Sequence, residues 1–553
     1  MRPTRPDRQV NHPLQNPGLD TWSLSPSLLP RMWYFQALAT GVSLACGYGV
    51  GLIARQIFRW SGITWRPSAE QRRWGWIGLG VAAAVLIPLF MILGAHWQKQ
   101  TRALIGVDDD SDGLYILVLL IALIVAIALI QLARGIGALW RRIAEFGRRW
   151  VPLPVAKVGG LALLVILGVA LLDGAVARVV LNVAERSYFA ADQNTRPGVV
   201  QPVSPKRSGS PESLEHWSTL GRDGRSFVAA GPDQARIEEV TGKAAEEPIR
   251  VYSGRASAET IAEIADNVVA ELDRTRAFDR TSLLVVTTTG RGWVNTAAAD
   301  AFEYINHGDS AIAAMQYSHL QSPFAYLADR QTPLQAGRLL LEAVYERWSQ
   351  LPEASRPKLY VMGESLGSYG MQGAVSSPQD MISRLNGGLL IGTPNFAEPW
   401  HRLTEERDPG SREILPVVDH GRHVRFAAED GDLELSQDWE APRFVYWQHA
   451  SDPITWWSLD LIYRRPDWLA EPLGSDVNPN MRWLPLVTFW QVAADMALSA
   501  GVPAGHGHAY GDAAAGLWAA ILDPEGWEES DTDRVREAIR SPETQLQPLG
   551  EIH

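Results

Sequence analysis

Four long runs of apolar residues stand out in the first third of the chain, and each is close to the ~20 residues that a helix needs to cross a bilayer. The first run is not a signal peptide, because it is too long and has a polar leader before it and further apolar runs after it. Tryptophans lie at or just beyond the ends of the runs, where an amphipathic ring suits the membrane interface. The pattern therefore predicts four transmembrane helices within residues 1–189, at about 33–54, 74–95, 113–133 and 158–181.

The charges of the loops between these runs predict how the chain is oriented. The first and third loops are rich in arginine, whereas the second has Lys99 and Arg102 beside several aspartates. Because positively charged segments resist translocation, the first and third loops are expected on the cytoplasmic side. Both termini would then be extracytoplasmic, although the arginines of the leader favour the opposite orientation.

The remaining two thirds of the chain have a different pattern. Residues 190–224 are rich in Pro, Ser, Gly and Gln without apolar periodicity, which is typical of a linker. Beyond them, short apolar runs alternate with longer amphipathic ones, and this alternation predicts a mostly parallel α/β domain over residues 225–553. The expected strands cover about residues 249–252, 282–287, 311–317, 358–362, 389–392 and 443–447, and the longer helices about 258–275 and 332–351.

Net charge and cysteine content narrow the possible functions. The net charge is -12 and no run of Lys and Arg lies beside aromatic residues, so nucleic acid is not an expected partner. The single cysteine, Cys46, excludes a disulfide framework, and the sequence has no zinc-type spacing of Cys and His. Neither a metal nor an organic cofactor is expected, and composition leaves the oligomeric state open.

The pentapeptide Gly363-Glu364-Ser365-Leu366-Gly367 lies directly after the expected strand 358–362 and before a helix-like segment. In this context a G-x-S-x-G sequence forms a sharp strand-to-helix turn that projects the serine hydroxyl from the sheet. The N-terminus of the following helix would also favour the negative charge of a tetrahedral intermediate. An ordinary glycine-rich turn is the alternative, but the flanking strand and helix favour Ser365 as a nucleophile.

A nucleophilic serine needs a base and an orienting acid, which follow it in the order acid, then histidine. Asp452 lies just after the expected strand 443–447 and is the predicted acid, with a plain Asp-Pro turn as the alternative. Either His506 or His508 is the predicted base. His508 is preferred because it lies nearer the following helix, which leaves His506 to shape the site. A metal site at these two histidines would need further ligands, and the sequence suggests none.

The oxyanion hole is expected to combine the backbone N–H of Leu366 with one N–H from the loop after strand 282–287. Gly290 and Gly292 in that loop let the backbone approach a substrate, so either Gly290 or Arg291 is the expected second donor. A plain glycine turn is the alternative interpretation of this loop.

Two later segments depart from a regular α/β pattern. No clear strand lies between Asp452 and the two histidines, because residues 483–498 have helical spacing instead. Residues 395–440 mix charges with Pro and Gly, which is typical either of a cap over the site or of a solvated surface insertion.

Five segments spread from the leader almost to the C-terminus carry a resemblance to a known family: SLSPSLLPR at 23–31, GESLGSYG at 363–370, SDPITWW at 451–457, RWLP at 482–485 and GHGHAY at 505–510. Together they resemble a bacterial, mainly actinobacterial, family of membrane-linked α/β-hydrolases. The resemblance implies an N-terminal multi-span membrane region followed by an α/β-hydrolase domain. It also implies a role in the cell envelope, on lipid or mycolate-type esters.

The predicted function is that of a serine hydrolase of the esterase or lipase type, in which Ser365 forms an acyl-enzyme that water then cleaves. The expected partners are the lipid bilayer and an acyl-ester or lipid substrate, with the catalytic domain outside the cell membrane. One alternative is an acyltransferase that passes the same acyl group to an alcohol. Another is a non-catalytic envelope scaffold, although a scaffold has no need of Ser365, Asp452 and two late histidines in this order.

Overall fold

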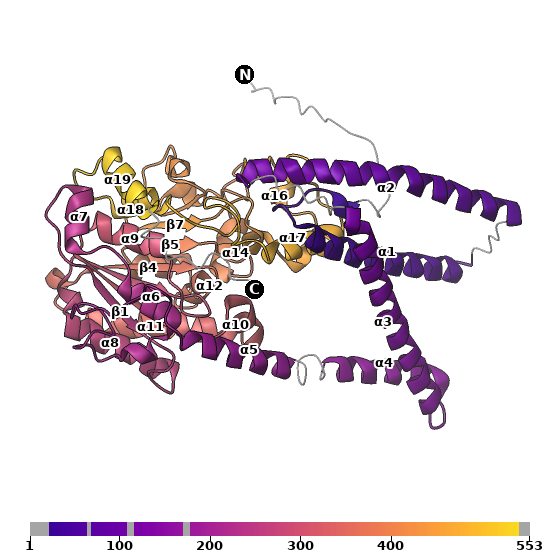
Figure 1. The fold of residues 1–553 in the computed structure, drawn as a ribbon, viewed down its shortest axis with the longest axis horizontal. Helices are drawn as coiled ribbons and strands as arrows, with labels where there is room; N and C mark the ends of the chain where they lie inside the picture. Colours follow the sequence, from indigo (N-terminus) through magenta and orange to yellow (C-terminus); the bar gives the residue numbers. More distant parts are fainter. Residues whose placement is uncertain (1–21, 63–67, 108–115, 170–176, 541–553) are drawn as a thin grey trace, which may run out of the picture.

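The computed structural model describes residues 22–62, 68–107, 116–169 and 177–540. Figure 1 shows an α/β domain at one end of the molecule and long N-terminal helices that extend away from it. The chain returns from these helices to the α/β domain through α5 (Ala177–Asp192).

Among the described residues, three N-terminal helices are long and apolar enough to cross a membrane: α1 (Trp33–Trp60), α2 (Ala69–Ile105) and α3 (Leu117–Gly147). The predicted fourth span differs. It begins in α4 (Leu153–Val169), an apolar helix of 17 residues, which at the usual rise would extend about 25 Å, short of the ~30 Å hydrocarbon core. Residues 170–176, which the prediction included, lie outside the described part of the chain. The described residues therefore include three helices that are long enough to span a membrane, and they do not show the fourth predicted span in full.

Some ends of these helices contact the α/β domain, and the others lie away from it. The start of α1 and the end of α2 contact it, and Asn478 Nδ2 donates to Thr101 Oγ1 at 3.0 Å. The end of α1 and the start of α2 lie away from it, as do the end of α3 and the start of α4 (Figure 1). Arginines such as Arg59, Arg72 and Arg148 are found at these distant ends.

The α/β domain is built on seven parallel strands in the order β1-β3-β2-β4-β5-β7-β6. All six predicted strands are present, and β6 is an addition from the irregular segment 395–440. This segment is therefore partly a strand at the edge of the sheet, not only a cap or a solvated insertion. The strands are β1 (Ile249–Ser253), β2 (Ser282–Thr287), β3 (Ser310–Met315), β4 (Lys358–Glu364), β5 (Gly387–Ile391), β6 (Val424–Ala427) and β7 (Arg443–Trp447).

Helices cover both faces of the sheet, because successive side chains of each strand point to opposite faces and both sets are apolar. In β2, Leu283 and Val285 belong to one buried cluster, whereas Leu284 and Val286 belong to another. The first cluster includes residues of α8 (Ile261–Thr275), α11 (Gln331–Ser349), α12 (Leu366–Gln372) and α17 (Val487–Met496). The second includes residues of α6 (Gly221–Ala229), α7 (Gln234–Thr241), α9 (Thr296–Ile305), α18 (Ala514–Leu522) and α19 (Glu529–Arg540).

Shorter helices lie in the connections around the sheet. They are α10 (Ser322–Ala328), α13 (Pro378–Arg384), α14 (Glu398–Glu405), α15 (Pro453–Trp456) and α16 (Asp467–Ala470). Between Asp452 and the two late histidines the structure has helices and no strand, as the helical spacing of this segment predicts.

The segment 190–224 is packed against the α/β domain along much of its length, rather than hanging free as a linker. Its Ser208 N–H donates to Arg250 O in β1 at 3.0 Å. Its Leu214 N–H donates to Glu271 Oε1 in α8 at 2.6 Å. Hydrogen bonds from its backbone therefore fix part of the path from the N-terminal helices to the sheet.

Candidate active site

Ser365 lies at the sharp turn between β4 and α12, with φ 55° and ψ -119°. A non-glycine residue rarely adopts this conformation, and such strain is concentrated at functional sites. The flanking glycines make the turn possible. A Cβ on Gly363 would lie 2.5 Å from Gly367 O, and one on Gly367 would lie 2.2 Å from Thr287 O. The turn is held at the sheet by the Ser365 N–H, which donates to Ile391 O at 2.9 Å.

Asp452 and His508 are in direct contact although 56 residues separate them in the chain. Asp452 is fully buried at the N-terminus of α15, where Oδ1 accepts from the Ile454 N–H at 2.8 Å. Its Oδ2 lies 2.7 Å from His508 Nδ1 and also accepts from the Tyr510 hydroxyl at 2.8 Å. A carboxylate can only accept, so His508 Nδ1 donates and, in the neutral ring, Nε2 carries the free lone pair.

The ring of His508 lies over the end of β5, beside the serine turn. A Cβ on Gly392 would lie 2.6 Å from His508 Cε1 and 2.9 Å from its Nδ1, so only glycine fits there. Gly392 directly follows Ile391, whose carbonyl accepts the Ser365 N–H. Within the described part of the chain, the buried Nε2 of His508 has no hydrogen-bond partner. The geometry leaves this nitrogen available to a reacting group.

Charges around His508 favour its protonated form. Burial by itself would lower the pKa of His508, but the charges of Asp452 and Glu364 and the hydrogen bond to Asp452 outweigh burial and raise it above 6.5. Glu364 is the residue between Gly363 and Ser365, and it accepts from Asn295 Nδ2 at 2.6 Å. Burial raises the pKa of Glu364 to about 7, although the nearby His508 and the Asn295 hydrogen bond act in the opposite direction.

His506, the other candidate base, faces a different carboxylate. Its Nδ1 lies 3.7 Å from Asp476 Oδ2, and the same carboxylate accepts from the Ser451 hydroxyl. The structure thus brings His508 to Asp452, whereas His506 lies beside Asp476 instead.

Gly507, between the two histidines, is held by the residues that precede Asp452. Its N–H donates to Ser451 Oγ at 2.8 Å, and its carbonyl lies 2.9 Å from His449 Nδ1. The ring of His449 also stacks on Tyr510, with centroids 4.3 Å apart. These contacts fix the backbone on both sides of His508.

The two segments that are expected to form the oxyanion hole, the start of α12 and the loop after β2, lie close together. Leu366 is the first residue of α12, so its N–H has no acceptor within the helix. The loop after β2 lies close by, because Thr287 O and Thr288 O surround the place of a Cβ on Gly367. The Gly290 N–H already donates to Ser322 Oγ at 3.2 Å, which favours Arg291 of the two expected second donors.

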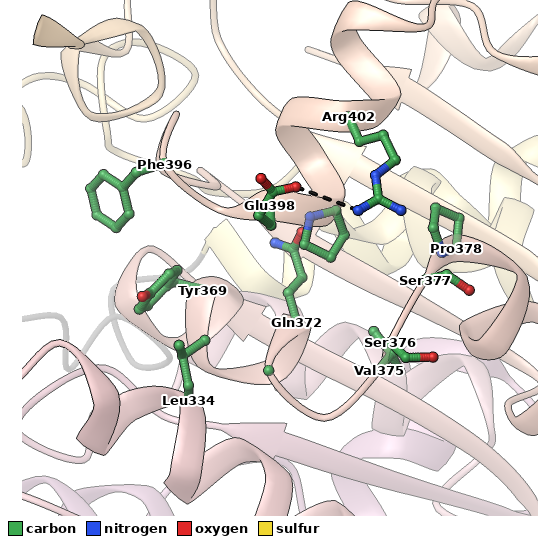
Figure 2. Close-up of a pocket in the computed structure, with 12 residues that line it drawn as sticks. Leu334, Tyr369, Gln372, Val375, Ser376, Ser377, Pro378, Phe396, Glu398 and Arg402 are labelled. Carbon is green, nitrogen blue, oxygen red and sulfur yellow. Dashed lines mark ion pairs between the residues drawn. The ribbon is translucent and has the colours of Figure 1, made fainter.

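A pocket of about 250 Å³ lies between α12 and α14. Figure 2 shows the side chains that line it, such as Leu334, Tyr369 and Phe396. Ser365 is not among its lining residues. The pocket begins one helical turn further on, at Tyr369, whose N–H donates to Ser365 O at 3.1 Å. The Phe396 ring stacks on Tyr326 of α10, with centroids 4.5 Å apart. The pocket therefore lies beside the serine turn and is bordered by aromatic rings.

Some residues of the site were not predicted from the sequence. The position of Glu364 inside the G-x-S-x-G motif could have marked it as a residue of the site. Its burial beside Asn295, however, depends on the fold. Tyr510 carried a weaker signal in GHGHAY, and nothing marked Asp476 or the role of His449. Among the described residues no group of three or more His, Cys, Asp and Glu could hold a metal ion.

A parallel sheet with a serine at the turn after its central strand, and an acid and a histidine on later loops, defines a domain of the α/β-hydrolase class. Residues 249–535 match the family model described as the alpha/beta-hydrolase family, and residues 24–232 match the model described as its N-terminus. The chain belongs to this alpha/beta-hydrolase family. A comparison with curated proteins and another with solved structures found no match.

Proposed function

We propose that this protein is a membrane-anchored serine hydrolase of the esterase or lipase type. Ser365 is the nucleophile, His508 the general base and Asp452 the residue that orients the base. The observation that carries the proposal is the 2.7 Å contact between Asp452 Oδ2 and His508 Nδ1, beside a serine held in a strained strand-to-helix turn. Membership of the alpha/beta-hydrolase family supports hydrolase activity.

In the proposed reaction, Ser365 Oγ attacks the acyl carbonyl carbon while its proton passes to His508 Nε2. The negative charge that forms on the carbonyl oxygen is stabilised by the N–H of Leu366 and a second N–H, for which Arg291 is favoured. Collapse of the tetrahedral intermediate breaks the ester bond, and His508 protonates the departing alcohol. A water molecule, deprotonated by His508, then releases the acid and restores Ser365.

An acyl ester of an envelope lipid is the proposed substrate class. Helix α10 lies between the serine turn and α5, because it packs with Leu366 in one cluster and its Phe324 ring contacts Tyr188 of α5 at 5.9 Å. Apolar side chains are exposed here, with Leu327 at 68% and Phe396 at 39% of their surfaces. Since α5 leads directly from the apolar N-terminal helices, this edge of the site suits a substrate that arrives from the membrane surface.

The proposed location is the cell membrane, with the α/β domain on the extracytoplasmic side. Arginines gather at the helix ends that lie away from this domain, and positive segments remain in the cytoplasm. To test the sidedness, Cys46 is replaced by Ser and a single cysteine is introduced at Arg149 or at Leu214, both exposed positions. A membrane-impermeant maleimide applied to intact cells should label the Leu214→Cys protein and not the Arg149→Cys protein. The reverse result would place the catalytic domain inside the cell.

The nucleophile is tested with a fluorophosphonate probe on the full chain in detergent or nanodiscs. Wild type should be labelled, and Ser365→Ala should not be, because the phosphonate bonds only to an activated serine. Ser349→Ala is the matched control, since Ser349 is exposed at the end of α11 and its hydroxyl donates to Glu346 O at 2.8 Å. Equal labelling of wild type and Ser365→Ala would place the active serine elsewhere. No labelling of folded wild type would favour a non-catalytic scaffold.

Hydrolysis is distinguished from acyl transfer by its products. A labelled acyl ester is incubated with the protein in the presence and absence of an alcohol acceptor such as glycerol or trehalose. Release of free acid in both conditions supports the hydrolase, whereas a new ester that forms only with the alcohol and requires Ser365 would make the protein an acyltransferase.

A further inference from the structure

The segment before the first apolar helix is buried in the α/β domain. Leu28 and Leu29 are fully buried and belong to the same core cluster as α8, α11 and α17. Gln491 of α17 donates from Nε2 to Ser25 O at 2.9 Å. Residues 23–31, here called the leader segment, are therefore part of the catalytic domain in space although the apolar helices separate them from it in sequence.

One carboxylate of α17 holds the leader segment in place. Asp495 is fully buried, and its Oδ1 accepts from Arg31 Nε at 2.6 Å. Its Oδ2 accepts from the Leu28 N–H at 3.1 Å, and the Ser27 hydroxyl also donates to it. A buried carboxylate with this many donors fixes both the charge and the backbone of its partner.

The leader segment also contacts the loop that carries His508. A Cβ on Gly507 would lie 3.3 Å from Leu29 Cδ2, so the Leu29 side chain packs against the backbone beside the histidine. The same position lies 2.9 Å from Ser499 O, which accepts the His508 N–H at 2.8 Å. Ser499 follows Asp495 by a single turn. One short stretch of chain, residues 495–508, thus joins the leader's ion-pair partner to the catalytic histidine.

We propose that the leader segment positions the catalytic histidine, with Leu29 acting as a positioning residue behind Gly507 and the Arg31–Asp495 pair as its anchor. The proposal rests on the proposed function of His508. The leader segment, which directly precedes α1, packs behind the loop that carries His508. Loss of this packing lets the loop move away from Asp452, so the activity depends on the N-terminal region and not only on the α/β domain.

Leu29→Ala in the full chain is the central test, because it removes the side chain behind Gly507 and leaves the Arg31–Asp495 pair intact. Leu272→Ala on α8 is the matched control, since both leucines are fully buried in the same cluster and Leu272 lies on a helix remote from the histidine loop. Leu29→Met keeps the volume and should restore the activity. All variants are compared well below their unfolding temperatures.

The first readout is the rate of fluorophosphonate labelling and its pH dependence. Leu29→Ala should be labelled at least about tenfold more slowly than wild type, because a small displacement of a catalytic group is costly. Its acid limb should move to lower pH, since a looser contact with Asp452 returns the pKa of His508 toward its ordinary value. Leu272→Ala should keep the wild-type pH dependence and a rate within about twofold of it, as a substitution that changes only stability would.

A second readout does not need catalysis. Hydrogen exchange of the peptide that spans residues 499–510 should become faster in Leu29→Ala and remain unchanged in Leu272→Ala, with β2 as an internal reference. The inference is overturned if both leucine variants lose labelling to the same extent, or if Leu29→Ala keeps wild-type labelling and exchange. Failure of the proposed function would be seen differently, as an absence of labelling in wild type itself.

Discussion

Glu364 lies near the proposed catalytic pair of Asp452 and His508, and it acts on His508 through its charge. Its negative charge raises the pKa of His508, and its own pKa is raised by burial to about 7. The charge of each group therefore affects the proton of the other. In the proposed mechanism, Glu364 would therefore help to set the pH at which His508 acts as a base.

Glu364→Gln should move the acid limb of the pH dependence of kcat/KM to lower pH. Only neutral His508 accepts the serine proton, and removal of a nearby negative charge lowers the pKa below which the ring is protonated. The amide can still accept from Asn295 Nδ2, so the packing is preserved. A surface change at the opposite end of β4, Glu353→Gln, serves as the control. An acid limb that stays in place or moves upward would contradict the coupling.

Asp452→Asn should lower kcat by about four orders of magnitude, because the amide no longer holds His508 in the tautomer whose Nε2 is free. The asparagine side chain can still accept the Ile454 N–H at the start of α15, so folding should be retained. Steady-state kinetics and a thermal unfolding curve measure the two effects separately. A variant that unfolds early but is active at low temperature would speak against this role.

The choice between His506 and His508 shows what a sequence leaves open at this scale. Both histidines occur in one Gly-His-Gly-His stretch, and each has a carboxylate within reach. The decision comes from Gly392, which clears the space for one ring, and from Ser451, which fixes Gly507. Both residues are remote in sequence, so no local pattern marks them.

Among the elements, those with uniform burial were predictable and those with mixed contacts were not. The strand β2, SLLVVT, was predicted with its observed bounds, because a parallel strand covered on both faces is a continuous apolar run. The strand β6, VRFA, was missed. Its Arg425 looks like a surface residue, yet the guanidinium is buried and donates to Gly421 O and other carbonyls of the same insertion.

The junction of α5 with the domain depends on Gln316, which follows β3. Its Nε2 donates to Asp192 Oδ2 at the end of α5, at 3.0 Å, and to Arg291 O in the expected oxyanion loop, at 3.1 Å. Its Oε1 accepts from the Arg255 N–H at 3.1 Å. One buried amide thus connects α5, which follows the apolar N-terminal helices, to the loop after β2 in the candidate site.

Gln316→Leu should destabilise the full chain by about 1–3 kcal/mol, because buried donors and acceptors lose their partners. It should also slow labelling of Ser365, since the carbonyl of Arg291 is no longer held. The control is Gln331→Leu on the exposed surface, which should change the stability by less than about 0.5 kcal/mol. Thermal unfolding in detergent measures both, and equal effects of the two substitutions would remove Gln316 from this role.

At the scale of the whole molecule, the sequence predicted an apolar N-terminal region followed by a hydrolase domain. It did not predict the contacts between the two. Residues 190–224 have the composition of a linker, but the backbone N–H groups of Ser208 and Leu214 are paired with β1 and α8 of the domain. The SLSPSLLPR segment was recognisable as a motif. Its partner Asp495, however, lies 464 residues from Arg31, and no periodicity connects two such distant positions.

Arg31→Met should destabilise the full chain by about 3–5 kcal/mol, because it leaves the charge of Asp495 buried without its partner. Combined with Asp495→Leu, the total loss should be smaller than the sum of the two single losses, since the second change removes the unpaired charge. Thermal unfolding of the three variants in one detergent gives this comparison. Strict additivity would mean that the two side chains do not stabilise each other.

The long separation between the leader segment and Asp495 has a consequence during biosynthesis. Asp495 is made by the ribosome 468 positions after its partner Ser27, which at roughly 5–20 residues per second is a delay on the order of half a minute or more. Through that interval the apolar helices are already leaving the ribosome while the groove for Leu28 and Leu29 does not yet exist. The leader segment can therefore take its place in the domain only after Asp495 has been made, when every residue of the apolar helices has already been translated.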